Sequence, residues 1–150
     1  MNYMYDSREN EMKIQLTEQK TIAIRMYRKN DFSSIQLLNQ EEDWNNLVQN
    51  EGTTRAAWDH SNVRYVLEDE ERIIGYVRGL TDENVTLYIC ELLIAKDYRG
   101  IGLGRQLLDY VRQMYPKTRV DLLASSSSYT YYEKHHYRPF YGFRKTWEEG

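Results

Sequence analysis

Hydrophobic residues at every second position open the patterned part of the chain. Ile22, Ile24 and Met26 alternate with other residues over 21–28, which predicts a half-buried β-strand. Asn30-Asp31 then forms a helix cap. Two apolar sets at helical spacing follow, namely Phe32, Ile35 and Leu38, then Trp44, Leu47 and Val48. The pattern therefore predicts a strand followed by helical pieces.

A second alternating region predicts a hairpin and then a buried strand. Hydrophobic residues alternate over 63–67 and recur over 73–77, with a charged turn at 69–71 between them. Residues 85–94 alternate at first and end in an apolar run, which is typical of a strand buried on both faces. Glu91 stands directly before that run.

Further elements are expected after this strand. In order, they are a glycine turn at 100–104, an amphipathic helix that ends before Pro116, a buried strand at 120–124, a serine loop at 125–128, a short helix at 129–136 and strands near 137–141 and 143–147. Residues 1–20 show no periodicity, so we expect a mostly flexible lead-in there and one domain over 21–150. The order of elements predicts a mixed α/β fold.

Composition restricts the class of protein. With 150 residues and 41% hydrophobic residues, the chain can build one core but not two. The mean hydropathy of −0.80 and the short apolar runs argue against a membrane span. The first ten residues lack the basic and apolar regions of a secretory signal, and Cys90 cannot form an internal disulfide, so we expect a cytoplasmic protein. One cysteine and three histidines argue against a metal site.

Charge is distributed unevenly along the chain. The net charge is −3, which argues against a nucleic-acid partner. Residues 96–119 nevertheless carry a net charge of +4, which leaves −7 for the rest. Acidic residues cluster at 41–43, 68–71 and 82–83. The basic segment suits an anion, whereas the acidic clusters are either solvated loops or a means of attracting a cationic substrate.

The glycine turn is the strongest candidate for a binding site. A strand that leads into a glycine-rich turn and a helix can bind phosphate through unpaired amides and the helix dipole. The turn over 99–104 matches neither the dinucleotide fingerprint nor the Walker A pattern. Gly102 and Gly104 let the backbone approach a pyrophosphate closely, while Arg99 and Arg105 add positive charge.

The R-x-x-G-x-G sequence at 99–104, with Tyr132-Glu133-Lys134 further along, resembles the GNAT superfamily of N-acetyltransferases. The resemblance extends over residues 21–147. It implies a GNAT-type mixed, mostly antiparallel central sheet that is splayed and flanked by helices. It also implies acetyl-CoA as co-substrate. Many relatives pair into homodimers, so a homodimer is a possible assembly of this chain.

The resemblance also assigns residues to the acetyl-CoA site. The backbone of Leu92, Leu93 and Ile94 would pair with the pantetheine arm. The residues that would hold the pyrophosphate are Arg99, Gly100, Ile101, Gly102, Leu103, Gly104 and Arg105. Tyr132 stands where the family has the general acid that protonates the departing thiolate, although a core aromatic is the alternative.

Two positions depart from the family pattern. Ser125 stands where many relatives have an asparagine that touches the pantetheine, and serine is shorter. His136 replaces a glycine that suits a left-handed helix end, at a cost of roughly 1 kcal/mol. We therefore expect His135 and His136 to be helix-terminal rather than catalytic.

Acetyl transfer to an amine also needs a base. A lysine-like amine has a pKa of about 10.4, so a base must take its proton at neutral pH. Glu91 is the leading candidate, with a partnered strand glutamate as the alternative. Arg78 and Asp82 are weaker candidates for contacts with the substrate. Tyrosines on the strands, such as Tyr65, Tyr76 and Tyr88, would suit the wall of an amine pocket.

Three functions remain open from the sequence. The leading hypothesis is transfer of the acetyl group of acetyl-CoA to a primary amine of a small molecule, by direct attack in a ternary complex. The alternatives are an N-acetyltransferase of proteins or peptides and a non-catalytic, acyl-CoA-binding regulatory module. Neither a nucleic acid nor a membrane is expected as a partner.

Overall fold

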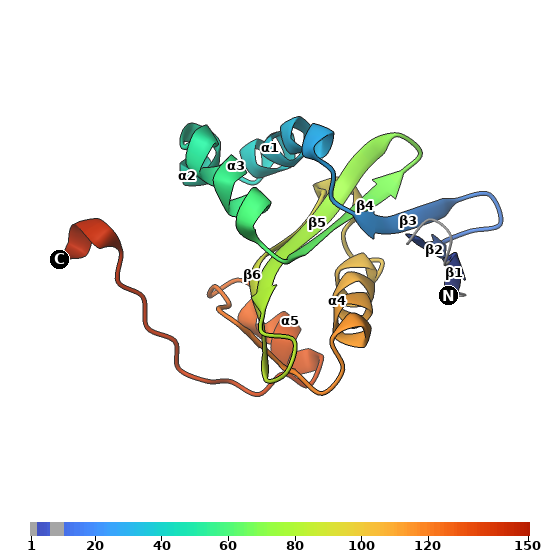
Figure 1. The fold of residues 1–150 in the computed structure, drawn as a ribbon. Coiled ribbons are helices and arrows are strands. Elements are labelled where there is room, and N and C mark those ends of the chain that lie inside the picture. Colours follow the sequence, from blue (N-terminus) through green and yellow to red (C-terminus); the bar gives the residue numbers. More distant parts are fainter. Residues whose placement is uncertain (1–2, 7–10) are drawn as a thin grey trace.

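A seven-stranded sheet forms the centre of the computed structural model, which describes residues 3–6 and 11–150 (Figure 1). The strands are β1 (Tyr3–Asp6), β2 (Glu11–Gln15), β3 (Thr21–Met26), β4 (Val63–Asp69), β5 (Arg72–Thr81), β6 (Thr86–Ile94) and β7 (Arg119–Leu122). They lie in the sheet in chain order, and all neighbours are antiparallel except the parallel pair β6 and β7. The expected mixed, mostly antiparallel sheet is confirmed.

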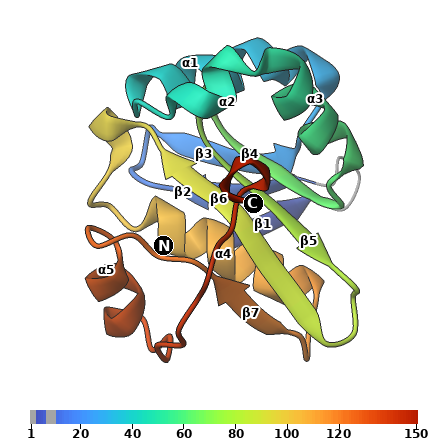
Figure 2. The ribbon, with the colours of Figure 1, turned by 90° about the vertical axis from the view of Figure 1, so that its left-hand side faces the viewer.

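Helices flank the sheet on both faces (Figure 2). They are α1 (Phe32–Glu41), α2 (Asn45–Gln49), α3 (Glu51–His60), α4 (Leu103–Met114) and α5 (Tyr129–Lys134), with short 3-10 turns η1 (Lys29–Asp31), η2 (Lys96–Tyr98) and η3 (Trp147–Glu149). The first three helices cover one face, and α4 covers the other. In the described part of the chain, no helix is long and apolar enough to cross a membrane.

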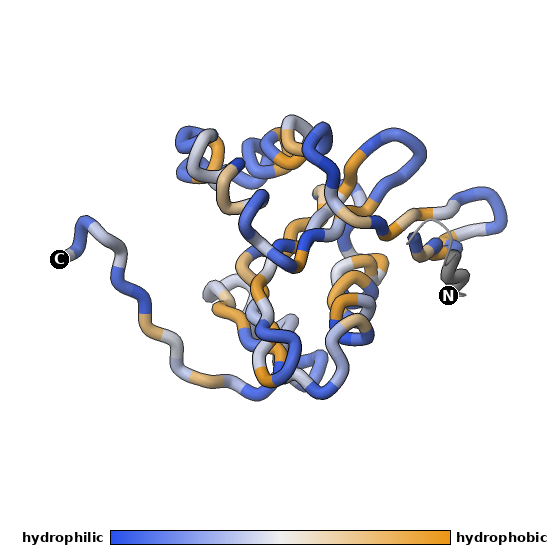
Figure 3. The backbone as a smooth tube through the Cα atoms, in the orientation of Figure 1, coloured by the Kyte–Doolittle hydropathy of each residue, from blue (hydrophilic) through white to orange (hydrophobic). Residues whose placement is uncertain are grey.

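The core forms on both faces of the sheet from the alternating positions that the sequence predicted. Ile22 and Ile24 of β3 are fully buried, and so are Leu107 and Val111 of α4. Figure 3 shows hydrophobic positions recurring along the central strands and α4, whereas the turn between β4 and β5 is hydrophilic. The amphipathic helix before Pro116 is confirmed.

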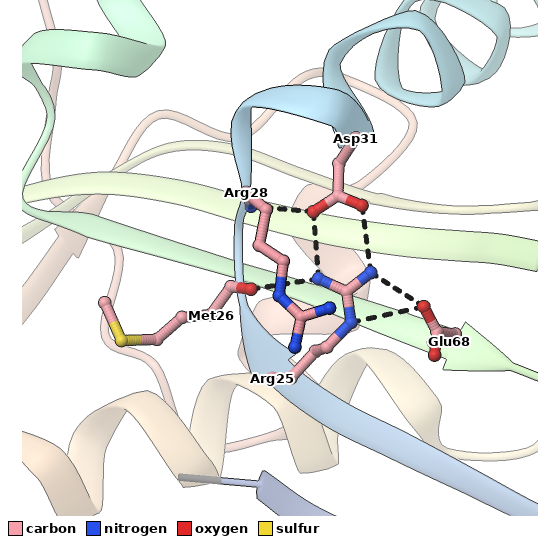
Figure 4. Close-up of polar contacts among 5 residues, drawn as sticks. All are labelled: Arg25, Met26, Arg28, Asp31 and Glu68. Atoms are coloured by element: carbon pink, nitrogen blue, oxygen red, sulfur yellow. Dashed lines mark hydrogen bonds and ion pairs between the residues drawn. The ribbon is translucent and has the colours of Figure 1, made fainter. Parts of the chain in front are cut away.

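A buried ionic cluster joins the end of β3 to the start of α1 (Figure 4). The guanidinium of Arg25 makes two 2.9 Å hydrogen bonds to the carboxylate of Asp31 and also donates to Glu68, at 2.7 and 3.2 Å. The amide of Arg28 donates to Asp31 at 2.7 Å. Burial alone would raise the pKa of Asp31, but the hydrogen bonds from Arg25 and Arg28 outweigh it, and the pKa lies below its ordinary value.

The expected flexible lead-in is wrong for the described residues before residue 21. β2 pairs with β3, and its side chains Met12 and Ile14 are buried in the core. β1 pairs with β2 in turn. Met12 and Ile14 are two residues apart, and two such apolar residues are enough for a strand when the edge of a neighbouring strand is available. The polar residues around them hide this pattern in the sequence. Residues 1–2 and 7–10 lie outside the described residues.

The two strands expected near 137–141 and 143–147 are absent, because neither segment has a strand partner in the described chain. Phe140 and Phe143 are exposed instead of packed. Aromatic residues favour extended backbone, but a strand also needs a neighbour that supplies hydrogen bonds. The short helix expected at 129–136 is present as α5 and ends two residues earlier.

Candidate active site

The strands β6 and β7 pair over only part of their length. Thr86–Ile89 pairs with Arg119–Leu122, and β7 then ends while β6 continues to Ile94. On its other side, β6 stays paired with β5 as far as Ile94. Among the described residues, 92–94 therefore have no strand partner on the β7 side, and we call them the open edge of β6. This gap is the expected splay of the sheet.

The glycine turn follows the open edge and starts α4. Gly100 and Gly102 have φ angles of +80° and +87°, which residues other than glycine rarely adopt. Gly102 is the N-cap of α4, and no side chain caps the helix there. The amides of the first turn are therefore left for another acceptor, at the positive end of a 12-residue helix. This end of α4 suits the phosphates of a ligand.

The two arginines expected at the turn are already engaged. Arg99 donates from Nε to the carbonyl oxygen of Ile94 at 2.8 Å and from Nη2 to the carboxylate of Glu42. Arg105 lies beside Asp109, with 3.8 Å between Nε and Oδ2. A phosphate at this turn would therefore meet backbone amides before either guanidinium. Arg99 instead links the end of the open edge to the end of α1.

Tyr132 lies on α5, where its ring packs at right angles to the rings of Tyr131 and Tyr137. Burial raises the pKa of Tyr132 to about 12, with smaller contributions from these two tyrosines. Tyr131 brings α5 against α4, since a Cβ on Gly104 would lie 3.4 Å from the Tyr131 hydroxyl. The hydroxyl of Tyr132 thus holds its proton at neutral pH.

Ser125 lies in the exposed loop between β7 and α5. Its hydroxyl is 2.9 Å from that of Ser127 and 3.0 Å from that of Ser128. At the other end of α5, His136 adopts a φ of +68°, in agreement with its place at a glycine position of the family pattern. The amides of His136 and Tyr137 close this helix end on the carbonyls of Glu133 and Tyr132.

Glu91 forms a partly buried ion pair with Arg78 across β5 and β6. Nη2 of Arg78 lies 2.7 Å from Oε2 and 3.0 Å from Oε1 of Glu91, and Nη1 donates to the hydroxyl of Ser61 at 3.0 Å. The side chains of Arg78 and Glu91 are 15% and 13% exposed. Oε2 is buried and receives no hydrogen bond of good geometry from any described residue. Both oxygens of Glu91 thus lie against Arg78, which agrees with the alternative of a partnered strand glutamate.

The ion pair belongs to the face of the sheet under α1–α3. Arg78 lies two residues after Tyr76 on β5, so both side chains point to one face. The ring of Tyr76 packs against Trp58 of α3 at 5.2 Å. In the pairing of β5 with β6, Arg78 lies opposite Glu91, but the next residue, Gly79, lies opposite Ile89. Cys90 therefore has no partner on β5, and β6 carries a β-bulge directly before Glu91.

A cavity of about 390 Å³ lies further along the same two strands, towards the start of β6. Its lining residues are His60, Asn62, Leu80, Thr81, Asp82, Thr86 and Tyr88. Oδ1 of Asp82 accepts the amides of Asn84, Val85 and Thr86, of which the Thr86 bond contributes most to lowering the pKa of Asp82. An ionised carboxylate and an aromatic ring thus meet in one cavity. Asp82 and Tyr88 were candidates from the sequence, but His60 and Leu80 were not. The prediction was wrong for Tyr65 and Tyr76, which are buried in the core instead of lining this cavity.

A larger cavity of about 510 Å³ lies at the opposite end of β5, between α1 and the β4–β5 turn. Glu41 of one acidic cluster and Asp69, Glu70 and Glu71 of another line it together. The cavity is therefore acidic, although its carboxylates come from distant parts of the chain. Among the described residues, no group of His, Cys, Asp or Glu could hold a metal ion.

A family model for an acetyltransferase (GNAT) domain matches residues 29–149. No curated protein matches the chain significantly.

Among solved structures, a GNAT-family acetyltransferase from Streptococcus pneumoniae TIGR4 is 18% identical, with a TM-score of 0.70 over 85% of this chain and 98% of that one. An aminoglycoside acetyltransferase from an uncultured soil metagenomic sample, in complex with sisomicin, is 16% identical, with a TM-score of 0.61 over 83% of this chain and 95% of that one. At these identities the likeness is one of fold. With four-fifths of the sequence matched by the family model, the chain belongs to the GNAT family of acetyltransferases.

Proposed function

We propose that the protein is an N-acetyltransferase that moves the acetyl group of acetyl-CoA to a primary amine of a small molecule. The observation that carries the proposal is the open edge of β6 next to the uncapped start of α4. Such an edge can accept an extended, amide-bearing ligand as an added strand, while the helix start accepts its phosphates.

The donor would lie along this edge. The backbone of Leu92, Leu93 and Ile94 would pair with the two amides of the pantetheine arm, and the turn over 99–105 would hold the pyrophosphate. The positive φ angles of Gly100 and Gly102 support this role, because such glycine turns commonly form concave sites of backbone amides that bind anions. Ser125 is a weaker candidate, since its hydroxyl already bonds within its own loop.

Glu91 would prepare the acceptor for attack. Taking a proton from an amine with a pKa of about 10.4 costs roughly 4.6 kcal/mol at pH 7. The carboxylate of Glu91 would accept that proton, directly or through one water, while Arg78 fixes its position. The nitrogen then forms a bond to the acetyl carbon, the carbon–sulfur bond breaks, and the thiolate leaves with the electron pair of that bond.

Tyr132 would supply the proton that the departing thiolate needs. Its pKa of about 12 keeps it protonated, although full transfer to a thiolate of ordinary pKa, about 8.5, is uphill. The hydroxyl would therefore act mainly as a hydrogen-bond donor as charge develops on sulfur. After the carbon–nitrogen bond forms, the nitrogen still carries one proton too many, and the loss of this second proton supplies the one that finally neutralises the thiolate.

The acceptor would occupy the cavity beside Asp82 and Tyr88. A carboxylate and an aromatic ring both favour a cationic amine. The chain shares its fold with an aminoglycoside acetyltransferase in complex with sisomicin. Because aminoglycosides carry several primary amines, this likeness supports a small-molecule amine as the acceptor. The cavity has a volume of about 390 Å³ and is shallow, so the acceptor would stay partly exposed to solvent.

Release of the thiol from acetyl-CoA tests the proposal directly. The full chain would be assayed with polyamines, aminoglycosides, amino acids and peptides, and calorimetry would measure acetyl-CoA binding in parallel. We expect turnover on a small-molecule amine and a raised KM for that amine in Asp82→Asn. Tight binding without turnover would identify a regulatory module instead, and turnover on peptides alone would make the protein a peptide acetyltransferase.

A further inference from the structure

Ser61 lies where α3 ends, in contact with the ion pair between Arg78 and Glu91. The residue is only 4% exposed. Its hydroxyl oxygen is 2.6 Å from the carbonyl oxygen of Ala57, in the last turn of α3, and 3.0 Å from Nη1 of Arg78. One buried hydroxyl thus connects the backbone of α3 to the guanidinium.

The direction of each hydrogen bond at Ser61 is fixed by the chemistry of its partners. A carbonyl oxygen can only accept, so the hydroxyl donates its proton to Ala57. A guanidinium can only donate, so the hydroxyl oxygen accepts from Arg78. Nη2 of Arg78 donates to Oε1 of Glu91 in turn. The carboxylate is therefore connected to α3 by an unbroken series of hydrogen bonds that has only one arrangement of protons.

The bond from Ser61 decides whether the guanidinium of Arg78 is held on one side or on two. Nη1 binds Ser61 and Nη2 binds Glu91, so the planar group has a fixed partner at each end. The side chains of the ion pair are 15% and 13% exposed, which leaves little room for water to replace a lost partner. Without the hydroxyl, Arg78 could turn about its long side chain and take the carboxylate with it.

The segment that contains Ser61 also contacts the proposed acceptor cavity. His60 and Asn62, its neighbours in the chain, line that cavity. Asn62 donates to the carbonyl oxygen of Thr81 at 2.7 Å and accepts from the Thr81 amide at 2.9 Å, which fastens the segment to the end of β5. Residues 60–62 therefore touch the cavity and the ion pair at once, and can set the position of one relative to the other.

We infer that Ser61 is a positioning residue, which acts through Arg78 to keep the carboxylate of Glu91 directed at the acceptor amine. The inference rests on the proposed function, in which Glu91 is the base. Ser61 touches the guanidinium and not the carboxylate, so its effect should appear in the step in which the amine loses its proton. Its loss should therefore change kcat and not the binding of either substrate.

Steady-state kinetics of Ser61→Ala test the inference. The variant should lower kcat about tenfold, an effect of the size that one hydrogen bond to a charged group supports. KM for the amine, and the Kd for acetyl-CoA measured by calorimetry, should stay within about twofold of wild type. Ser61→Thr keeps the hydroxyl and should retain most of the wild-type kcat.

Thr54→Val is the matched control for the loss of a buried hydroxyl on α3. Thr54 is 5% exposed, and its hydroxyl donates to the carbonyl oxygen of Leu47 at 2.7 Å. Denaturant titration should show a loss of stability similar to that of Ser61→Ala, while kcat stays at the wild-type value. An equal loss of kcat in both variants would overturn the inference, because destabilised packing of α3 would then explain it.

A double-mutant cycle separates positioning of the base from a general effect on the fold. In the Glu91→Gln background, Ser61→Ala should cause no further loss of kcat, since the base that it positions is absent. A loss that persists undiminished in that background would overturn the inference, and so would a wild-type kcat for Ser61→Ala. In both cases the turnover of wild type would still uphold the proposed function. No turnover by wild type on any amine would overturn the proposed function and the inference together.

Discussion

Arg78 and Glu91 face each other across the β5–β6 ladder, with 2.7 Å between Nη2 and Oε2. Burial opposes the charge of Arg78, but the hydrogen bond and charge of Glu91 outweigh it, and the pKa of Arg78 lies above its usual value. The arginine therefore stays charged and holds the carboxylate in one place. In the proposed reaction, this contact orients the base.

Glu91→Gln should lower kcat by roughly a hundredfold or more at pH 7, since general bases contribute about 10²–10⁴-fold. The loss of kcat should shrink as the pH approaches the pKa of the free amine, about 10.4, because the amine then loses its proton without a base. Glu83→Gln, in the exposed β5–β6 turn, is the control and should leave kcat unchanged. A deficit that is the same at every pH would show that Glu91 acts through the fold and not as a base.

Tyr132→Phe should lower kcat while leaving the Kd for acetyl-CoA within about twofold, since the substitution removes one donor and keeps the ring. With a pKa of about 12, the hydroxyl keeps its proton below about pH 11, so the effect should not depend on pH in the ordinary range. Tyr137→Phe, in the same aromatic cluster, is the matched control. Equal kcat values for wild type and Tyr132→Phe would make Tyr132 a packing residue.

Gly102→Ala should destabilise the fold by about 1–2 kcal/mol, because a side chain at a φ of +87° meets the adjacent backbone. It should also weaken acetyl-CoA binding, measured by calorimetry, since the first amides of α4 depend on this turn. Gly52→Ala is the control. Gly52 lies in α3 with open space around it, so the alanine should stabilise the fold by roughly 0.5 kcal/mol and leave binding unchanged.

His136→Gly should raise the free energy of unfolding by about 1 kcal/mol, because glycine adopts a φ of +68° without strain. Denaturant titration followed by circular dichroism measures the change. His136→Ala keeps the Cβ and should bring no gain. If glycine and alanine had the same effect, backbone strain at this helix end would not be the cause.

Asp31→Asn should lower the free energy of unfolding by about 3–5 kcal/mol, the usual cost of breaking a buried ion pair. Because the pKa of Asp31 is lower in the folded chain than in the unfolded one, its stabilisation is present above about pH 4 and is lost as the pH falls through the folded value. Denaturant titrations between pH 7 and 3 should therefore show a smaller acid loss for the variant. Asp59→Asn, on the exposed side of α3, should keep the wild-type slope.

Features that depend on neighbouring residues could be predicted from the sequence. Three such features are local, and each has the expected conformation. They are the alternation of Ile22 and Ile24, the glycine turn before α4 and the left-handed backbone of His136. Which segments pair with a neighbouring strand could not be predicted from the sequence. Met12 and Ile14 form a strand because β3 offers an edge, whereas the segment with Phe143 forms none because no strand of the described chain pairs with it.

The candidate site was predictable in the same limited way. Glu91 and the turn from Arg99 onwards were named from the sequence, but their contacts depend on the fold. The bulge at Cys90 sets Glu91 opposite Arg78, and no local pattern contains that register. Arg99 was expected to face a pyrophosphate, yet its guanidinium lies on Ile94 and Glu42, which only the packing of α1 near the turn explains.

Strand order also bears on how the chain folds. From β1 to β6, each strand pairs antiparallel with the strand before it, so pairing can follow the chain as it is synthesised. Only β7 must wait, because its parallel pairing needs the whole crossover through α4 first. The gap between β6 and β7 is thus completed after the rest of the sheet. Pulsed hydrogen exchange during refolding should find the amides of β4 and β5 protected before those of β7.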